Sequence, residues 1–119
     1  MEKLITEIKN FKNISLITLK GNLTAEADDP LFTLVISVLS GGFKRIVFDL
    51  SKVQYINSAG FGILIALVDE IKNSQGKVKF AALSPHFKKT AKLIGLHRFA
   101  DFYRTVDEAF TSLKRDESK

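Results

Sequence analysis

The sequence contains no cysteine and no tryptophan. Without cysteine, a disulfide framework, a cysteine-ligated metal and a thiol nucleophile are all excluded. The absence also fits a reducing compartment. Without tryptophan, aromatic packing in the core falls mainly to the ten phenylalanines.

Long apolar runs are missing as well. The longest candidate, residues 61–68, ends at Asp69-Glu70, far short of the about 18 residues that a membrane-spanning helix needs. The first twelve residues include Glu2 and Glu7 and lack the basic-then-apolar order of a signal peptide. We therefore expect a cytoplasmic protein without a membrane span.

The usual signatures of catalytic sites are absent. His86 and His97 lie eleven residues apart, with no metal-ligand spacing to each other or to a carboxylate. Ser58 lacks the glycine two positions before it that a nucleophile elbow requires. Residues 41–44 lack the spacing of a phosphate-binding P-loop. We predict no enzyme activity, no cofactor and no metal.

The basic charge is scattered. The formal net charge is +5 and the sequence pI is about 9.5, but the lysines and arginines form only short pairs. A long basic run with interleaved aromatics, as in many nucleic-acid-binding segments, is absent. We interpret the charge as a solvated surface and predict no direct binding of nucleic acid.

The sequence does contain alternating strand and helix patterns, over a length that fits a single domain. Its 119 residues are close to the commonest domain size. We expect an ordered core over about 3–113 and a frayed tail over 114–119. Period-two and period-3.6 patterns predict the order β-β-α-β-α-β-α-(β)-α, an α/β fold with a mixed, mostly parallel sheet and helices packed on it. The predicted strands are 3–9, 14–19, 44–50, 77–83 and 103–106; the predicted helices begin near Pro30, Phe61, Pro85 and Asp107, and the last runs through Leu113.

The segment Gln54 to Gly62, QYINSAGFG, stands at a predicted strand-to-helix corner. Asn57 or Ser58 can cap the helix, and Gly60 permits a tight corner. Backbone N–H groups at a helix start also attract anions, so a phosphate on Ser58 could be held there without unfolding the domain. The residues alone leave both interpretations open.

The same stretch resembles the STAS domain of bacterial anti-sigma factor antagonists, over roughly residues 44–110. The family pattern is a strand ending in Asp-Leu-Ser, an apolar segment, Asp-Ser-Ser/Ala-Gly and a helix. A second strand, Ser-Pro and a later Gly-Leu follow. The corresponding residues are Asp49-Leu50-Ser51, 53–56, Asn57-Ser58-Ala59-Gly60, Ser84-Pro85 and Gly95-Leu96, with weaker support at Gly21-Asn22-Leu23-Thr24.

The resemblance implies a partner switch. An unphosphorylated antagonist binds an anti-sigma factor that is itself a serine kinase, of the histidine-kinase-like ATPase type, and so releases a sigma factor for transcription. The kinase phosphorylates the serine that corresponds to Ser58, the complex dissociates, and a serine phosphatase resets it. The residues implied around the phosphorylation site and partner surface are Asn57, Ala59, Gly60, Phe61, Gly62, Asn22 and Thr24.

This chain departs from the family pattern at two of those positions. Asn57 and Thr24 replace the usual acids, which eases the arrival of a phosphate electrostatically and removes contacts that a kinase uses. Phe61 is either an exposed anchor for a partner or part of the core, and we favour the core.

Two other functions stay open at this stage. One is a non-switching STAS scaffold or transporter-accessory subunit, in which Ser58 only caps a helix. The other is a nucleotide- or lipid-binding domain that uses the basic surface. For the oligomeric state, the sequence allows a monomer or a weak dimer.

Overall fold

The computed structural model describes residues 3–117. Strands and helices alternate along the chain in the predicted order. The strands are β1 (Ile5–Phe11), β2 (Ile14–Leu23), β3 (Arg45–Ile56), β4 (Lys77–Ala81) and β5 (Asp101–Tyr103). The helices are α1 (Asp28–Ser40), α2 (Ser58–Asn73), α3 (Pro85–Leu93) and α4 (Val106–Glu117), with short 3-10 turns η1 (Ala25–Ala27) and η2 (Leu96–Arg98).

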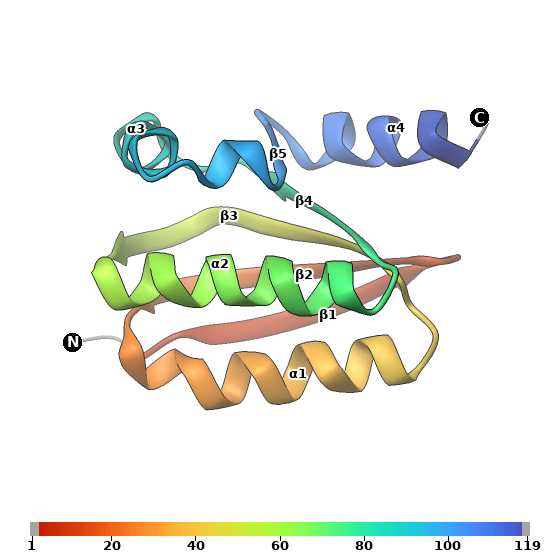
Figure 1. The fold of residues 1–119 in the computed structure, drawn as a ribbon, viewed down its shortest axis with the longest axis horizontal. Coiled ribbons are helices and arrows are strands. Elements are labelled where there is room, and N and C mark those ends of the chain that lie inside the picture. Colours follow the sequence, from red (N-terminus) through yellow and green to blue (C-terminus); the bar gives the residue numbers. More distant parts are fainter. Residues whose placement is uncertain (1–2, 118–119) are drawn as a thin grey trace.

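The strands form one sheet in the order β1-β2-β3-β4-β5 (Figure 1). β1 pairs antiparallel with β2 through a two-residue turn at Lys12-Asn13, and all other pairs are parallel. Parallel neighbours need a crossover, and here each crossover contains a helix. The predicted mixed, mostly parallel sheet is confirmed.

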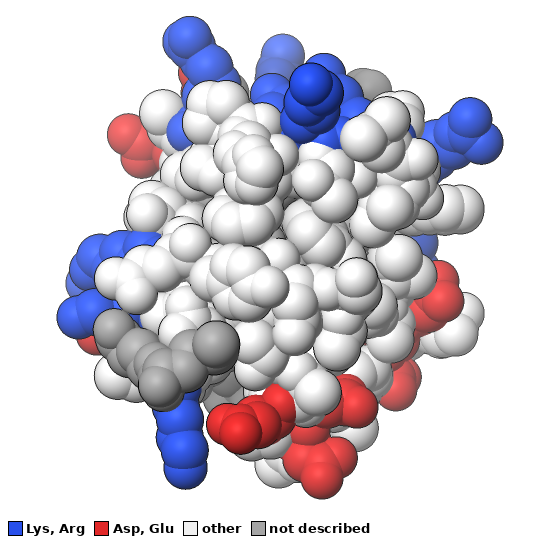
Figure 2. All heavy atoms as spheres, turned by 90° about the vertical axis from the view of Figure 1, so that its left-hand side faces the viewer, with Lys and Arg blue, Asp and Glu red and all other residues white. Residues whose placement is uncertain are grey.

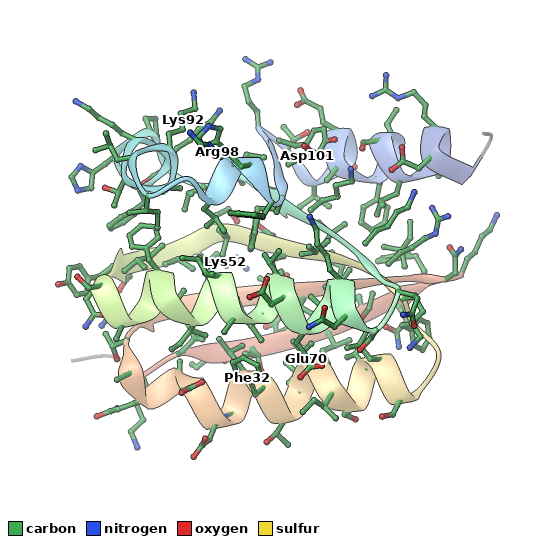
Figure 3. All side chains as sticks on the ribbon, in the orientation of Figure 1. Phe32, Lys52, Glu70, Lys92, Arg98 and Asp101 are labelled. Carbon is green, nitrogen blue, oxygen red and sulfur yellow. The ribbon has the colours of Figure 1, made fainter. Side chains whose placement is uncertain are left out.

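Two hydrophobic layers hold the helices on opposite faces of the sheet. The larger layer lies under α1 and α2, where Phe48 and Phe80 stack with ring centroids 5.5 Å apart. Phe32 projects from α1 into the space beside α2 and packs on this layer (Figure 3). The smaller layer joins Val47 and Ala81 to α4 on the other face. Successive residues of β3 therefore face opposite layers, which explains the continuous apolar run of residues 46–48.

The C-terminal part differs most from the sequence prediction. β5 lies at 101–103, two residues before the predicted strand, and α4 begins at Val106. The hydroxyl of Thr105, not the carboxylate of Asp107, accepts a hydrogen bond from the N–H of Glu108 at 3.1 Å. The predicted frayed tail is helical through residue 117, since Asp116 forms ion pairs that hold this end on the sheet; residues 118 and 119 lie outside the described chain.

Candidate functional site at the start of helix α2

The site is built where β2 and β3 end side by side. Leu23 pairs with Ile56 in the parallel register, so both strands reach the same edge of the sheet. The N–H of Asn57 then donates to the carbonyl of Leu23 at 3.3 Å. This bond ties the first residue after β3 to the end of β2 and fixes where α2 begins.

Gly60 brings α2 against that strand end. A Cβ at this position would lie far inside van der Waals contact with the Leu23 carbonyl oxygen and 2.9 Å from a methyl group of Ile56. Only a residue without a side chain permits so close an approach of helix and strand. Gly60 is therefore a packing residue of the corner.

Asn57 is the residue that caps α2. Its backbone is extended, and its side-chain Oδ1 accepts a hydrogen bond from the N–H of Gly60 at 2.9 Å. The sequence left Asn57 and Ser58 as alternative caps, and the geometry assigns the role to Asn57. The prediction that Ser58 caps α2 is therefore wrong, and this result bears on the cap alone, not on the scaffold role.

Ser58 is the first residue of α2, and its side chain is exposed. Within residues 3–117 its hydroxyl has no hydrogen-bond partner. The N–H groups of Ser58 and Ala59 stand in the first turn, where no intrahelical acceptor exists. An exposed hydroxyl thus lies beside two free donors at the positive end of a helix dipole.

An open hollow of about 340 Å³ adjoins Ser58. Phe61 forms its floor: it is only 6% exposed and contacts Phe87 of α3, with ring centroids 6.4 Å apart. The preference for Phe61 as a core residue is confirmed. The hollow is lined by Tyr55, Ile56, Asn57, Ser58, Phe61, His86, Phe87 and Thr90.

Sequence reasoning missed the α3 side of this hollow. The hydroxyl of Ser84 accepts from the N–H of Phe87 at 3.5 Å, and Pro85 occupies the first turn, as the Ser-Pro pair predicts. β4 runs parallel to β3, so α3 and α2 start at the same edge of the sheet. That juxtaposition, which follows from the predicted topology, is the signal that could have found His86 and Thr90.

The remaining predicted residues divide between two places. Ala59 and Gly62 are exposed on α2 next to Ser58. Asn22 and Thr24 flank Leu23 in the chain and line a separate pocket of about 440 Å³ beside the start of α1. The structure therefore joins the two predicted segments through Leu23 but places them in different hollows.

Charge is distributed unequally around this end of the molecule. Residues 71–100 contain seven lysines and arginines and no acidic residue, whereas 21–43 contain three acidic residues and no basic one. Figure 2 shows a broad face without charged side chains at its centre, with Lys and Arg along its upper and left margins and most Asp and Glu below and to the lower right, where α1 begins. Lys92 and Arg98 project on the α3 and η2 side (Figure 3).

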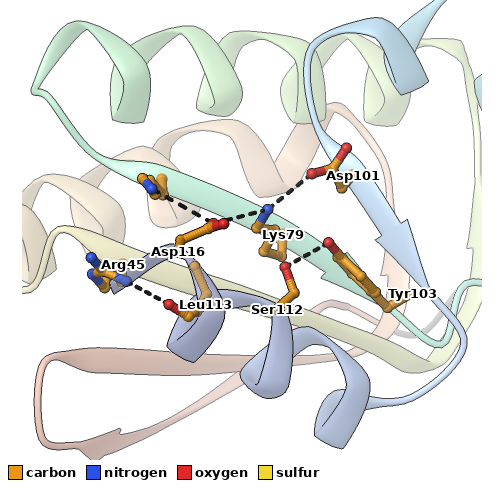
Figure 4. A network of polar contacts seen from close by, with 8 residues as sticks. Arg45, Lys79, Asp101, Tyr103, Ser112, Leu113 and Asp116 are labelled. Atoms are coloured by element: carbon orange, nitrogen blue, oxygen red, sulfur yellow. Dashed lines mark hydrogen bonds and ion pairs between the residues drawn. The ribbon is translucent and has the colours of Figure 1, made fainter. Parts of the chain in front are cut away.

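A second polar cluster lies away from Ser58, between β4, β5 and α4 (Figure 4). Lys79 is only 8% exposed, and its ammonium lies 2.9 Å from Asp101 and 3.6 Å from Asp116. The hydroxyls of Tyr103 and Ser112 share a hydrogen bond of 2.6 Å. These groups bind one another and so hold α4 against the sheet.

Burial alone would lower the pKa of Lys79, but the hydrogen bond and charge of Asp101, aided by Tyr103 and Asp116, raise it above the ordinary value. Burial alone would raise the pKa of Asp116, but Lys79 and Lys77 lower it. Both groups are therefore held in their charged forms.

Within residues 3–117, no three His, Asp or Glu side chains come together as ligands for a metal ion. Over the same part of the chain, every helix is too short or too polar to cross a membrane.

A model of the STAS domain family matches residues 6–109. The chain belongs to the STAS domain family. This STAS domain is 25% identical over 77 residues to a Bordetella bronchiseptica protein named anti-sigma factor antagonist BtrV, spanning 65% of this chain and 66% of BtrV. It is 32% identical over 79 residues to a Thermotoga maritima protein of the same description, spanning 65% of this chain and 68% of that one. The alignments thus cover about two thirds of each relative's length.

Solved structures support the fold at lower identity. An anti-sigma factor antagonist from Mycobacterium paratuberculosis has a TM-score of 0.82 at 23% identity, covering 94% of this chain and 95% of that one. The phosphorylated form of the Bacillus cell fate determinant SpoIIAA has a TM-score of 0.72 at 18% identity, covering 92% and 99%. A sulfate transporter family protein from Wolinella succinogenes has a TM-score of 0.80 at 12% identity, covering 92% and 91%. The resemblance found in the sequence is confirmed: this is a STAS domain like those of anti-sigma factor antagonists.

Proposed function

We propose that this STAS domain is an anti-sigma factor antagonist regulated by phosphorylation of Ser58. In its unphosphorylated form it binds an anti-sigma factor that is a serine kinase, and a sigma factor is released. The kinase then phosphorylates Ser58, which ends the complex, and a serine phosphatase restores the binding form.

The observation that carries the proposal is that Asn57 caps the helix and leaves the hydroxyl of Ser58 exposed. Asn57 already supplies the cap of α2, through a 2.9 Å hydrogen bond to the Gly60 N–H. The Ser58 hydroxyl is exposed and unpartnered within the described chain. A phosphate on Ser58 would therefore break no internal contact, and the free N–H groups of the first turn would favour its charge.

The lack of charged side chains around Ser58 explains how one phosphate would change binding. A phosphoserine brings about −1.5 to −2 charges to a hollow whose lining residues include no Lys, Arg, Asp or Glu. Burying such a dianion against a partner without matched cations costs several kcal/mol. Since each ~1.4 kcal/mol is tenfold in affinity, the loss would be tenfold or more.

The fold does not choose between a switch and a scaffold, because a sulfate transporter family protein shares it. The names of the relatives favour the switch: both the Bordetella bronchiseptica and the Thermotoga maritima relatives described above are called anti-sigma factor antagonists. SpoIIAA, a protein of the same fold, exists in a phosphorylated form. The direct test is therefore whether a serine kinase phosphorylates Ser58 in this chain.

The experiment compares the wild-type protein, Ser58→Ala and Ser58→Asp for binding to serine kinases of the same genome, with and without ATP. Mass spectrometry of the peptide that contains Ser58 locates any phosphate. Thr111→Asp, an exposed position on α4, is the control for added charge elsewhere.

We expect phosphate on Ser58 and at least tenfold weaker binding of Ser58→Asp than of Ser58→Ala. We expect Thr111→Asp to bind like the wild type. Equal binding of Ser58→Ala and Ser58→Asp, with no phosphate on Ser58, would contradict the switch and favour a scaffold role.

A further inference from the structure

Strand β1 is an open edge of the sheet. It lies outside β2 in the strand order, and within residues 3–117 no other strand pairs with it (Figure 1). All seven of its residues are exposed. Three of them are large and apolar: Ile5 is 52% exposed, Ile8 38% and Phe11 47%. An open strand edge with apolar side chains is a ready template for another strand.

The hairpin determines which backbone groups of β1 are free. Phe11 pairs with Ile14 across a two-residue turn, and such a closing pair exchanges both of its hydrogen bonds. Because the direction alternates along a strand, Phe11, Lys9 and Glu7 bond toward β2. The N–H and C=O groups of Thr6, Ile8 and Asn10 therefore point to the open edge.

Paired antiparallel with a second copy and centred on Ile8, the strand complements itself. Thr6, Ile8 and Asn10 then meet Asn10, Ile8 and Thr6 of the other copy, so that every outward backbone group finds a partner. Glu7 lies opposite Lys9 in both halves, and Ile5 lies opposite Phe11. Cross-strand pairs of opposite charge and of apolar side chains are the ones that stabilise antiparallel sheets.

The neighbouring registers are less favourable. Keeping the outward groups paired requires that the centre move by whole residues, so the next registers are centred on Glu7 or on Lys9. The first places Glu7 opposite Glu7, and the second places Lys9 opposite Lys9. Like charges directly opposite one another are destabilising. Among these central registers, only the one on Ile8 pairs both charges with their opposites.

In this register the apolar side chains of β1 also lie on the same faces of the sheet as the two hydrophobic layers. Ile8 pairs within the hairpin with Ile17, a residue of the core under α1 and α2. Phe11 lies on the other face, where its ring contacts Phe110 of α4 with centroids 5.6 Å apart. A pair of β1 strands would therefore extend both layers: Ile8 against Ile8 on one face, and Ile5 beside Phe11 and Phe110 on the other.

We propose that this surface, residues 5–11, binds a second copy of the chain and forms a two-fold dimer with a continuous ten-stranded sheet. The symmetry closes, so the dimer uses up the open edge and cannot grow further through it. The Ser58 hollow is formed by β3, α2 and α3 and does not include β1. The dimer would carry two such sites, and the inference stands whether or not Ser58 is phosphorylated.

The test is a charge swap, read out by analytical ultracentrifugation over a concentration series. Glu7→Lys makes both facing positions basic, and Lys9→Glu makes both acidic. Each pair occurs twice in the dimer, so each single variant should weaken dimerisation about tenfold. The double variant Glu7→Lys/Lys9→Glu restores opposite charges and should dimerise like the wild type. Mixing the two single variants should yield a heterodimer.

A second variant tests the hydrogen bonds. Ile8→Pro removes an N–H that β2 does not use, and proline is tolerated on a strand edge. It should abolish the dimer, while circular dichroism and the melting temperature stay close to the wild type. A wild-type protein that remains monomeric up to about 1 mM would overturn the proposal, since a dimer with so high a dissociation constant would not form at ordinary protein concentrations. A dimer unaffected by Lys9→Glu and by Ile8→Pro would also overturn it, because another surface would then be responsible.

Discussion

The two polar regions of this molecule treat their hydrogen-bonding groups in opposite ways. At the start of α2, the Ser58 hydroxyl and the first N–H groups of the helix face solvent, beside a hollow whose lining residues include no Lys, Arg, Asp or Glu. Between β4, β5 and α4, the ammonium of Lys79 and the hydroxyls of Tyr103 and Ser112 bind partners inside the chain. The polar groups at the start of α2 are therefore available to a partner, whereas those of Lys79, Tyr103 and Ser112 are already paired within the chain.

The difference indicates where function lies. Polar groups that are satisfied internally stabilise the fold, and a change there is felt as lost stability. Polar groups that are exposed and unpartnered contribute little to folding, so they are free to be modified or bound. The start of α2 also has a rigid foundation, since Gly60 and Asn57 both attach it to the Leu23 end of β2. Variants of Gly60 and Asn57 change the attachment of α2 to the sheet, whereas variants of Ser58 change only an exposed group.

Replacing Gly60 should have the largest effect. In Gly60→Ala the new methyl group collides with the Leu23 carbonyl oxygen and with Ile56, so α2 must shift from the strand. We expect a loss of about 3 kcal/mol or more in the free energy of unfolding, measured by urea denaturation. Gly62→Ala is the matched control in the same helix, since a methyl group there meets open space. It should be neutral or stabilising by up to ~1 kcal/mol. Equal losses for both variants would show that the corner is not as tight as described.

Replacing Lys79 should have the next largest effect. Lys79→Met keeps most of the side-chain volume but removes the cation between Asp101 and Asp116, and these two carboxylates remain near each other without it. Asp101 is largely exposed and regains water, which limits the loss to about 1–2 kcal/mol. Hydrogen exchange of α4 amides should rise with little change in α2. Protection lost equally in both helices would contradict a local role for the network.

The same network predicts how stability depends on pH. The pKa of Lys79 is raised above 10.5, so its contribution is complete below that pH and is lost as the pH rises through the raised value. The pKa of Asp116 is lowered below 3.8, so its contribution is present above that pH and is lost as the pH falls through the lowered value. Thermal melts across pH should therefore decline at both ends, and Lys79→Met should flatten both declines. A variant with the wild-type pH profile would assign the dependence to other groups.

The corner at Ser58 was predictable because its determinants are local. A buried strand, Asn-Ser-Ala-Gly and an apolar 3.6-residue period specify a strand, a turn and a helix within the continuous stretch 45–73. The end of α4 was not predictable in this way, since it depends on Asp116 reaching Lys77 and Lys79 on a strand 37 to 39 residues earlier. The choice between Asn57 and Ser58 as the cap also needed the structure, because both residue types accept hydrogen bonds at a helix start.

The smallest expected effects come from Asn57→Ala and Ser58→Ala. The difference between their free energies of unfolding tests whether Asn57 alone caps α2. Asn57→Ala removes the acceptor of the Gly60 N–H and should cost about 1 kcal/mol in the free energy of unfolding. Ser58→Ala removes an exposed hydroxyl without a partner in the described chain and should stay within about 0.5 kcal/mol of the wild type. Both are measured by urea denaturation under identical conditions. If Ser58→Ala costs as much as Asn57→Ala, the Ser58 hydroxyl supports the helix, and a phosphate there would disturb the fold as well as the binding surface. If only Asn57→Ala is costly, any binding defect of Ser58→Asp belongs to the surface alone.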